Sequence, residues 1–269
     1  MSVHSQHQNI TLTRLHEMKV GKEKIACLTA YDSSFAALLD QAKVDVILVG
    51  DSLGMVIQGH DSTVAVTMED MIYHSQCVTS VVKRAFVIAD MPFMSYTNVE
   101  QALTNATDLI QLGGAQMVKL EASVRQVSIV RELSECGIPI CAHLGLRPQY
   151  IHKLGGYAMQ GKDDASANEL FESAESLQAA GADMLLLECV PNELANKITQ
   201  SCSIPVIGIG AGPACDGQIL VLHDALGVTQ SINQGVTPKF AKDFLQEAKN
   251  IPTAISNYVD DVKKLRFPT

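Results

Sequence analysis

The feature that most constrains the fold is an apolar run that ends in an acid and recurs along the chain. Val46–Val49 leads through one glycine into Asp51. A short apolar run bounded by a turn signal is typical of a strand that is buried on both faces. Three later runs end in the same way, at Asp90, Glu121 and Glu188. Because α/β proteins bind ligands at the carboxyl ends of parallel strands, these four acids predict one active site.

The apolar runs together predict eight strands that alternate with helices. We expect these strands at Ile25–Ala30, Val44–Gly50, Phe86–Asp90, Gln116–Glu121, Ile138–Ala142, Ala182–Glu188, Ile204–Ile209 and within Gln218–Leu222. The alternation indicates an α/β protein, and 269 residues suit one (β/α)8 TIM barrel of about 250 residues. A doubly wound open sheet is the alternative. We favour the closed barrel because acids from the second, third, fourth and sixth strands meet naturally at its mouth.

The layout of the chain is predicted to be simple. We expect residues 1–24 to form an N-terminal lead with a short helix over Thr11–Val20. The barrel is expected to occupy residues 25–269 as a single domain, because the sequence contains no linker, low-complexity tract or internal repeat.

Several helix starts are predicted from capping residues. Ser33 or Ser34 is expected to cap the first helix of the barrel. Capping boxes are predicted at Thr67–Asp70 and at Thr97–Glu100. Near the end of the chain, Pro238 is expected to open a helix that runs to about Lys249.

Composition and charge limit the possible partners. A net charge of −9 and a pI near 5.3 argue against nucleic acid or an anionic membrane. The seven cysteines form no CxxC pair and no zinc-like spacing with histidine, which favours reduced thiols in a cytoplasmic protein. No signal-peptide pattern and no membrane-spanning apolar run are present. We therefore expect a cytoplasmic protein whose partners are neither nucleic acid nor a membrane.

Three glycine-bearing stretches follow predicted strands. Leu144–Asp164 has little helical period and is predicted to be an active-site lid, with a plain surface loop as the alternative. Ser52–Ala65 is predicted to be an active-site loop. Gly208–Gly212 resembles a phosphate-binding loop of barrels, although such glycines also permit close packing.

The acids on the first three of these strand ends predict a metal site. Carboxylates that converge repel each other unless a cation or a proton lies between them. Without a cysteine and histidine cluster, oxygen ligands favour a hard cation such as Mg²⁺. Asp51, Asp90 and Glu121 are therefore the predicted metal ligands. Each of them taken alone would more often cap a helix or order a loop.

Other polar residues at these strand ends are candidates for substrate contacts and proton transfer. Lys119 lies on the same strand face as Glu121 and is expected to hold a substrate anion or to pair with an acid. Ser52 could donate to that anion or cap a turn, and His143 could donate to a ligand or simply pack. Glu188 stands apart, and burial would raise its pKa toward that of a general acid or base. Its alternative role is a salt bridge at the rim.

With these residues placed, the sequence resembles the ketopantoate hydroxymethyltransferase family. The resemblance extends from about residue 25 to residue 240. Two residues, Ala122 and Ser123, depart from the family pattern, in which glycines are usual. The matching motifs, in order, are Thr29–Asp32, Val49–Gly54, Gln58–Thr63, Ala89–Phe93, Met117–Glu121, His143–Leu146, Gly155–Tyr157, Leu187–Pro191, Gly208–Gly212, Asp216–Gln218 and Pro238–Phe240.

The resemblance implies a reaction and two substrates. The family moves a hydroxymethyl group from 5,10-methylenetetrahydrofolate to 3-methyl-2-oxobutanoate, with Mg²⁺, to give 2-dehydropantoate in the first committed step of pantothenate synthesis. The resemblance also implies a large homo-oligomer. The residues that match family positions are Asp51, Asp90 and Glu121 for the metal, Asp51, Ser52, Asp90 and Lys119 for the keto acid, and Glu188 for the general base.

Two other functions stay open at this point. One is a Mg²⁺-dependent barrel of the phosphoenolpyruvate mutase and isocitrate lyase type, which also stabilises enolates of 2-oxo acids. The other is a non-catalytic barrel that binds a metabolite for regulation. A folate requirement would separate the first from the expected transferase, and Mg²⁺-dependent turnover would exclude the second.

Overall fold

The computed structural model describes residues 9–229 and 238–268, and its eight parallel strands close into a barrel in chain order. The first strand pairs with the last, with Ile25 opposite Gly217. This closure confirms the predicted TIM barrel and rules out the open sheet. The strands are β1 Ile25–Thr29, β2 Val46–Val49, β3 Phe86–Asp90, β4 Met117–Glu121, β5 Ile140–Gly145, β6 Met184–Glu188, β7 Val206–Ile209 and β8 Gly217–Leu220.

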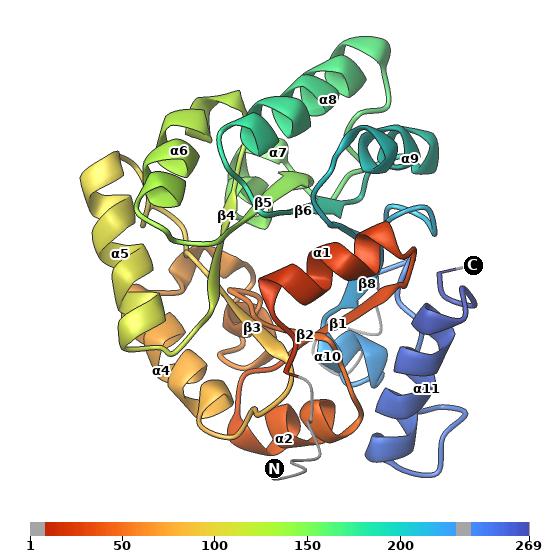
Figure 1. Cartoon of the computed structure of the whole chain (residues 1–269). Helices are drawn as coiled ribbons and strands as arrows, with labels where there is room; N and C mark the ends of the chain where they lie inside the picture. Colours follow the sequence, from red (N-terminus) through yellow and green to blue (C-terminus); the bar gives the residue numbers. More distant parts are fainter. Residues whose placement is uncertain (1–8, 230–237, 269) are drawn as a thin grey trace, which may run out of the picture.

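Helices surround the barrel on its outside (Figure 1). The α-helices are α1 Leu12–Val20, α2 Ser33–Gln41, α3 Leu53–Val56, α4 Met68–Thr79, α5 Val99–Gln111, α6 Val127–Glu135, α7 Ile151–Leu154, α8 Asp164–Ala179, α9 Asn192–Ser201, α10 Leu222–Ala225 and α11 Ile251–Lys263. Short 3-10 helices are η1 Thr63–Ala65, η2 Val124–Gln126 and η3 Pro148–Tyr150.

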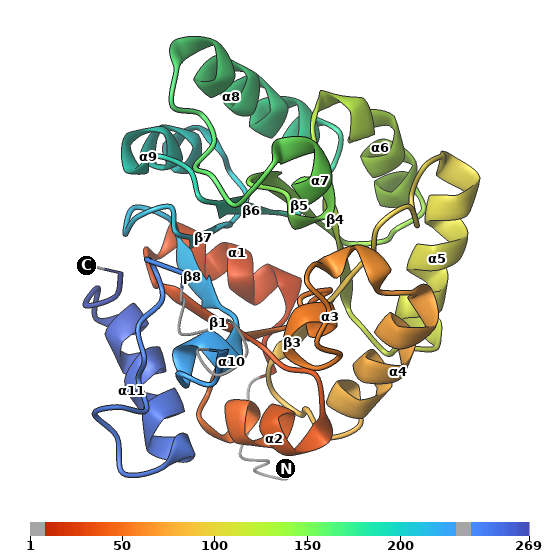
Figure 2. The same cartoon turned by 180° about the vertical axis from the view of Figure 1, so that it is seen from behind.

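The predicted N-terminal helix closes one end of the barrel. α1 lies in front of the strands in Figure 1 and behind them in Figure 2, whereas α3 and α7 lie in front in Figure 2. Leu15 and Met18 of α1 are buried, and Lys19 Nζ lies 2.6 Å from Asp216 Oδ2, directly before β8. α1 therefore covers the end where the strands begin. Residues 1–8 of the predicted lead are outside the described residues.

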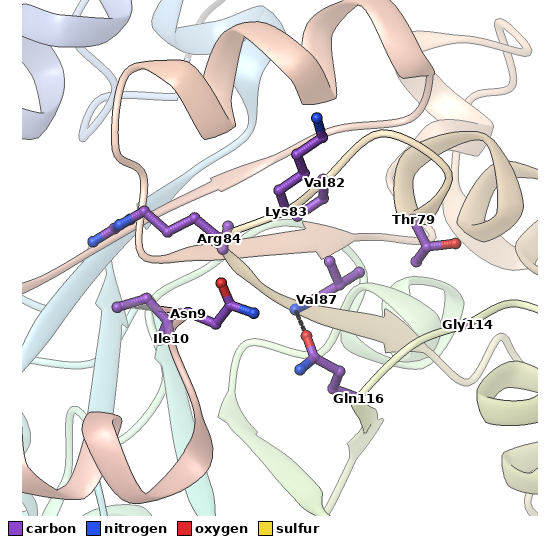
Figure 3. A pocket seen from close by; sticks show the side chains of 10 residues that line it. Asn9, Ile10, Thr79, Val82, Lys83, Arg84, Val87, Gly114 and Gln116 are labelled. Atoms are coloured by element: carbon purple, nitrogen blue, oxygen red, sulfur yellow. Dashed lines mark hydrogen bonds between the residues drawn. The ribbon is translucent and has the colours of Figure 1, made fainter. Parts of the chain in front are cut away.

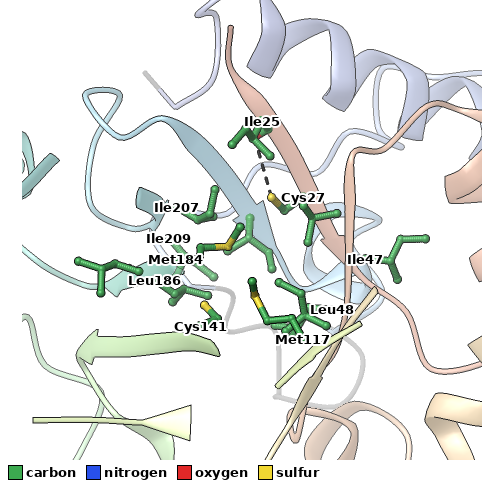
Figure 4. Close-up of a cluster of buried hydrophobic side chains, with 14 of the residues drawn as sticks. Ile25, Cys27, Ile47, Leu48, Met117, Cys141, Met184, Leu186, Ile207 and Ile209 are labelled. Carbon is green, nitrogen blue, oxygen red and sulfur yellow. Dashed lines mark hydrogen bonds between the residues drawn. The ribbon is translucent and has the colours of Figure 1, made fainter. Parts of the chain in front are cut away.

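The core lies inside and around the barrel (Figure 4). The buried side chains labelled there come from six strands: Ile25, Cys27, Ile47, Leu48, Met117, Cys141, Met184, Leu186, Ile207 and Ile209. Strands that are apolar on both faces are expected in an all-parallel sheet that helices cover. Tyr258 Oη of α11 is placed to donate to the carbonyls of Cys27, at 2.8 Å, and Gln218, at 2.9 Å, which ties α11 to β1 and β8. All seven cysteines are free, as predicted.

Two predicted helix caps are displaced. α2 is capped by Asp32, whose Oδ1 accepts from the backbone N–H of Ser34 at 2.8 Å, so the prediction of Ser33 or Ser34 is wrong. α5 is capped by Asn98, one residue after the predicted Thr97. The box at Thr67 is confirmed. Aspartate and asparagine accept these bonds at least as well as serine, and a neighbouring serine or threonine in the sequence obscures the choice.

The helix predicted from Pro238 to about Lys249 is wrong. The described residues from 238 to 250 form turns, and the last helix begins after the cap Asn250. Asp243 Oδ1 accepts from the backbone N–H groups of Leu245 and Gln246, at 2.8 and 3.1 Å. A short polar side chain that bonds the backbone in this way competes with a helix.

No helix in residues 9–229 and 238–268 combines the length and the apolar character that crossing a membrane requires.

Candidate active site

The ends of β2, β3, β4 and β6 bring the four predicted acids to one end of the barrel. The register aligns Asp90 with Lys119 and Gly145 with Glu188 on neighbouring strands. The backbone N–H of Asp51 donates to Asp90 Oδ2 at 2.9 Å, which joins the first two acids directly. The strands thus assemble side chains that lie far apart in the sequence, as their shared strand-end position predicts.

Lys119 forms a buried ion pair with Asp90. The two side chains are only 6% and 3% exposed. Burial alone would lower the pKa of Lys119, but the charges of Asp90 and Asp51 outweigh it and raise that pKa. The ammonium group therefore stays charged. Of the two predicted roles for Lys119, the ion pair is present, and an ammonium group with three donors can still bind an anion.

Asp51 and Glu121 are buried acids that share one environment. Burial raises the pKa of Asp51 to about 7, and the negative charge of Asp90 is the second largest contribution. Burial, followed by the charge of Asp51, raises the pKa of Glu121 well above its usual range. Glu121 Oε2 is buried without a hydrogen-bond partner among the described residues. A buried acceptor of this kind costs free energy unless a cation or a proton satisfies it.

Gln149 links these two acids, although no motif in the sequence marks it as a site residue. Its backbone N–H donates to Glu121 Oε1 at 3.0 Å, and its side-chain Nε2 donates to Asp51 Oδ2 at 2.8 Å. It belongs to η3, inside the stretch predicted to be a lid. The only feature of the sequence that could have indicated a role for Gln149 is its location after a strand, at the end of the barrel where the acids lie.

Ser52 follows Asp51 and points its hydroxyl at another side chain. Ser52 Oγ lies 2.9 Å from Tyr31 Oη, and it makes no capping bond to α3, which it precedes. Burial raises the pKa of Tyr31 above its usual value, so the phenol stays protonated. The Ser52 hydroxyl is therefore held beside the acids by a neutral partner.

Glu188 and His143 form a second pair at the mouth. His143 Nε2 lies 3.3 Å from Glu188 Oε2, yet neither ring nitrogen has a well-aligned hydrogen bond among the described residues. Burial lowers the pKa of His143 far below its usual value, with Lys119 adding to the effect, so the imidazole is neutral. Burial raises the pKa of Glu188 to about 7. A carboxyl group with this pKa suits general acid–base chemistry near neutral pH.

The backbone carbonyl of Glu188 lies so close to the neighbouring strand β5 that the residue there, Gly145, must lack a side chain. Gly145 has φ +93°, and a Cβ added there would lie 2.3 Å from the carbonyl oxygen of Glu188. Only glycine tolerates this close approach. Cys189, which follows Glu188, also has a positive φ of 48°. The backbone next to the predicted base therefore adopts conformations that most residues disfavour.

The stretch predicted to be a lid contains η3 and α7, so it is partly helical. Gln160 donates its backbone N–H to the carbonyl of Cys189 at 2.8 Å, and Tyr157 Oη donates to Met55 Sδ at 3.6 Å. The stretch thus contacts both sides of the mouth. Its movement stays a prediction.

The glycines after β7 serve close packing. A Cβ at Gly210 would lie 2.7 Å from the ring of Phe240, and one at Gly212 would lie 2.3 Å from the side chain of Asn192. These contacts favour the packing alternative over a phosphate-binding loop.

A cavity of about 240 Å³ lies at the opposite end of the barrel (Figure 3). It is lined by residues that include Ile10, Arg84, Val87 and Gln116, near the starts of β3 and β4. The carboxamide oxygen of Gln116 accepts from the backbone N–H of Val87 at 3.0 Å. None of the predicted site residues lines this cavity, so it is separate from the candidate active site.

The donor set fits a hard cation, and the prediction that Asp90 is a ligand beside Asp51 and Glu121 stays a prediction. In the described part of the chain, no three histidine, cysteine, aspartate or glutamate side chains are grouped so that they could hold a metal ion. Asp90 is occupied by Lys119 and the backbone of Asp51. Asp51 and Glu121 remain as buried acids with raised pKa values. Mg²⁺ commonly takes one or two carboxylates and leaves its other positions to water and substrate.

The fold and this mouth define a class: a (β/α)8 barrel whose candidate site is built from carboxylates at the strand ends. Comparison with known proteins defines the family. Residues 9–269 match the family model described as ketopantoate hydroxymethyltransferase, and the chain belongs to this family of enzymes, as the resemblance predicted.

Curated relatives match nearly the whole chain. The chain is 56% identical to the 3-methyl-2-oxobutanoate hydroxymethyltransferase of Alkalilimnicola ehrlichii, over 96% of this chain and 92% of the relative. It is also 56% identical to that of Nitrosococcus oceani, over 96% and 97% of the two chains.

Solved structures with low sequence identity share the fold. Phosphonopyruvate hydrolase in complex with oxalate and Mg²⁺ has a TM-score of 0.62 at 13% identity, over 83% of this chain and 84% of that one. A 2,3-dimethylmalate lyase of the phosphoenolpyruvate mutase/isocitrate lyase superfamily has a TM-score of 0.60 at 15% identity, over 95% and 96%.

Proposed function

We propose that this protein transfers a hydroxymethyl group from 5,10-methylenetetrahydrofolate to 3-methyl-2-oxobutanoate, giving 2-dehydropantoate in the first committed step of pantothenate synthesis. Membership of the ketopantoate hydroxymethyltransferase family supports the overall reaction. The observation that carries the chemistry is the convergence of two raised-pKa acids, a charged lysine and a separate carboxyl base at one barrel mouth.

Asp51 and Glu121 are the residues that would hold Mg²⁺ directly, with Asp90 beside them. The partnerless Oε2 of Glu121 and the raised pKa values of both acids support a cation here. When bound, Mg²⁺ would draw charge from the ketone oxygen of a 2-oxo acid and stabilise its enolate. Phosphonopyruvate hydrolase, which shares the fold, was crystallised with oxalate and Mg²⁺, and oxalate resembles the two adjacent oxygens of a 2-oxo acid.

Lys119, Ser52 and Asp90 would orient the keto acid. Lys119 Nζ donates to Asp90, and its remaining N–H groups are available to the substrate carboxylate. The Ser52 hydroxyl, held by Tyr31, can donate to the same group. His143 is neutral and buried next to Glu188, so it can hydrogen-bond either the substrate or the base without adding charge.

Glu188 would act as the general base. Its carboxylate takes the proton from C3 of the keto acid, and the electron pair left behind forms the enolate. Overall, the one-carbon unit gains a C–C bond to the enolate carbon and a hydroxyl group from water, while both of its C–N bonds to the folate break. The two folate nitrogens take up two protons, one derived from C3 and one from the water. A pKa near 7 keeps a useful fraction of Glu188 ionised at neutral pH.

A turnover assay tests the proposal. Formation of 2-dehydropantoate should require both 5,10-methylenetetrahydrofolate and a divalent cation, should stop with EDTA and should recover with Mg²⁺. Cleavage of a 2-oxo acid without folate would instead favour the phosphoenolpyruvate mutase and isocitrate lyase type of activity. A large homo-oligomer and a cytoplasmic location also belong to the proposal and stay predictions.

A further inference from the structure

We infer that Gln149 is a positioning residue that holds the carboxylates of Asp51 and Glu121 in place for a divalent cation. The inference rests on the proposed function, because it assumes a cation at this pair of acids. Gln149 is only 3% exposed and comes from η3, outside the strands that carry the acids. It is the one described residue that donates hydrogen bonds to both of them.

The two donors of Gln149 leave one oxygen of each acid uncommitted. The backbone N–H donates to Glu121 Oε1 at 3.0 Å, and Nε2 donates to Asp51 Oδ2 at 2.8 Å. Glu121 Oε2 has no partner, and no hydrogen bond among the described residues reaches Asp51 Oδ1. Ionised carboxylates accept but cannot donate, so N–H donors are what can fix two such groups side by side. The uncommitted oxygens are the atoms left for a cation.

The orientation of the Gln149 amide is itself fixed. Tyr96 Oη donates to Gln149 Oε1 at 2.5 Å, while Nε2 also donates to the carbonyl of Met91 at 2.9 Å. A flipped amide would turn its oxygen toward Asp51 and the Met91 carbonyl, which are both acceptors. Only the observed orientation satisfies all three neighbours. Tyr96, which is 8% exposed, therefore supports the cation site through Gln149.

A purely space-filling role makes a different prediction. If Gln149 served only packing, a methionine of similar length would replace it with no effect on cation binding. Methionine keeps the backbone N–H that bonds Glu121 but lacks the Nε2 donor that bonds Asp51. If this side-chain donor orients Asp51, the same change should weaken cation binding. Groups that orient metal ligands typically contribute about 10–100-fold to metal affinity.

The experiment measures Mn²⁺ binding to the whole protein by electron paramagnetic resonance, with Mn²⁺ alone as the probe. Gln149→Met should weaken Mn²⁺ binding about 10–100-fold and alter the spectrum of the bound ion. Tyr96→Phe removes a single hydrogen bond and should weaken binding about two- to tenfold. Gln76→Met is the matched control, because Gln76 is exposed and its Nε2 bonds only the Leu112 carbonyl.

The outcomes separate this inference from the proposed function. Wild-type affinity in Gln149→Met and Tyr96→Phe, both still unfolding cooperatively, would overturn the positioning role. So would an equal loss in Gln76→Met. If Gln149→Met fails to fold, Tyr96→Phe decides the question alone. A wild-type protein that binds no Mn²⁺, or whose binding survives Asp51→Ala, would overturn the cation site itself and with it both claims.

Discussion

A buried aspartate lies near each end of strand β2, Asp45 before it and Asp51 after it, and the two differ in their charged partners. Asp45, directly before the strand, has Arg84 at 2.9 Å and Lys263 at 2.5 Å, and accepts from the backbone N–H of Ala26 at 3.0 Å. Asp51, two residues after the strand, has a single amide donor, Gln149, on its side chain. The two residues are 1% and 5% exposed.

Asp45 and Asp51 differ in how their buried charge is compensated. At the end covered by α1, each oxygen of the carboxylate meets a cation, which offsets the cost of burying it. At the mouth, burial and the neighbouring acid raise the pKa of Asp51 to about 7, and nothing in the described structure neutralises it fully. Groups left in this state are typical of functional sites.

The largest effect should come from Asp51→Asn, which removes a proposed metal ligand. Turnover should fall by more than the 10–100-fold typical of groups that only orient a ligand. Without divalent metal, the same variant should be more stable than the wild type at pH 8. A raised pKa in the folded state costs stability above about pH 7, and this cost disappears as the pH falls toward 4.

Thermal unfolding in EDTA between pH 4 and pH 8 measures the stability effect. A stability gain that is constant with pH would contradict the assignment of the raised pKa to Asp51. Asp90→Ala tests the prediction from the sequence that Asp90 is also a ligand: full metal-dependent activity in this variant would remove Asp90 from the site.

At the opposite end, Asp45→Ala should affect stability and leave catalysis intact. The change removes the buried member of this ion cluster, so that Arg84 and Lys263 lose their closest acid, although Lys263 keeps Glu23 at 3.4 Å. Because the two cations are partly exposed, the cost should be at most about 3–5 kcal/mol. Urea unfolding measures this loss, with Lys264→Ala as the control, because its exposed pair with Asp260 contributes at most about 1 kcal/mol. A lower kcat/KM for folded Asp45→Ala would contradict the claim that Asp45 contributes to stability alone.

The pH profile should reflect Glu188. Its pKa is raised to about 7, so the basic carboxylate form decreases as the pH falls below 7. The rate of C3 proton exchange should therefore decrease about tenfold per pH unit below that point and level off above it. An exchange rate that is flat down to pH 5 would show that another group accepts the proton.

The smallest effect should be slower hydrogen exchange in residues 144–164 when Mg²⁺ and keto acid bind. This stretch contacts Met55 and Cys189 on opposite sides of the mouth, so closing over substrate would add protection. The turns at 238–250 are the internal control and should not change. Equal exchange with and without ligand would make the stretch a surface loop.

The parts predicted correctly from sequence are those encoded locally. An apolar run followed by an acid identifies both a strand and its carboxyl end, and this correctly placed Asp51, Asp90, Glu121 and Glu188 at one end of the barrel. Lys119 followed from strand alternation. The neutral state of His143 did not, because burial among neighbouring strands decides it.

The parts that could not be predicted depend on partners distant in the chain. Gln149 lies 98 residues from Asp51, and nothing near it in the sequence marks its donors as the ones that reach both acids. Likewise, nothing near Tyr96 in the sequence indicates that its hydroxyl bonds Gln149. The helix wrongly expected after Pro238 shows the same limit, since Asp243 bonds the local backbone and Phe244 packs on Tyr258 with ring centroids 5.3 Å apart.

In the proposed reaction, Glu188 at this mouth is the base that removes the C3 proton of 3-methyl-2-oxobutanoate. The most direct measurement is exchange of that proton with solvent deuterium, followed by NMR with Mg²⁺ and without folate. Glu188→Gln should slow the exchange about 10²–10⁴-fold while Mg²⁺ and keto acid still bind with near-normal affinity. Wild-type exchange in this variant would contradict the account, and would place Glu188 in the folate half of the reaction if turnover alone were lost.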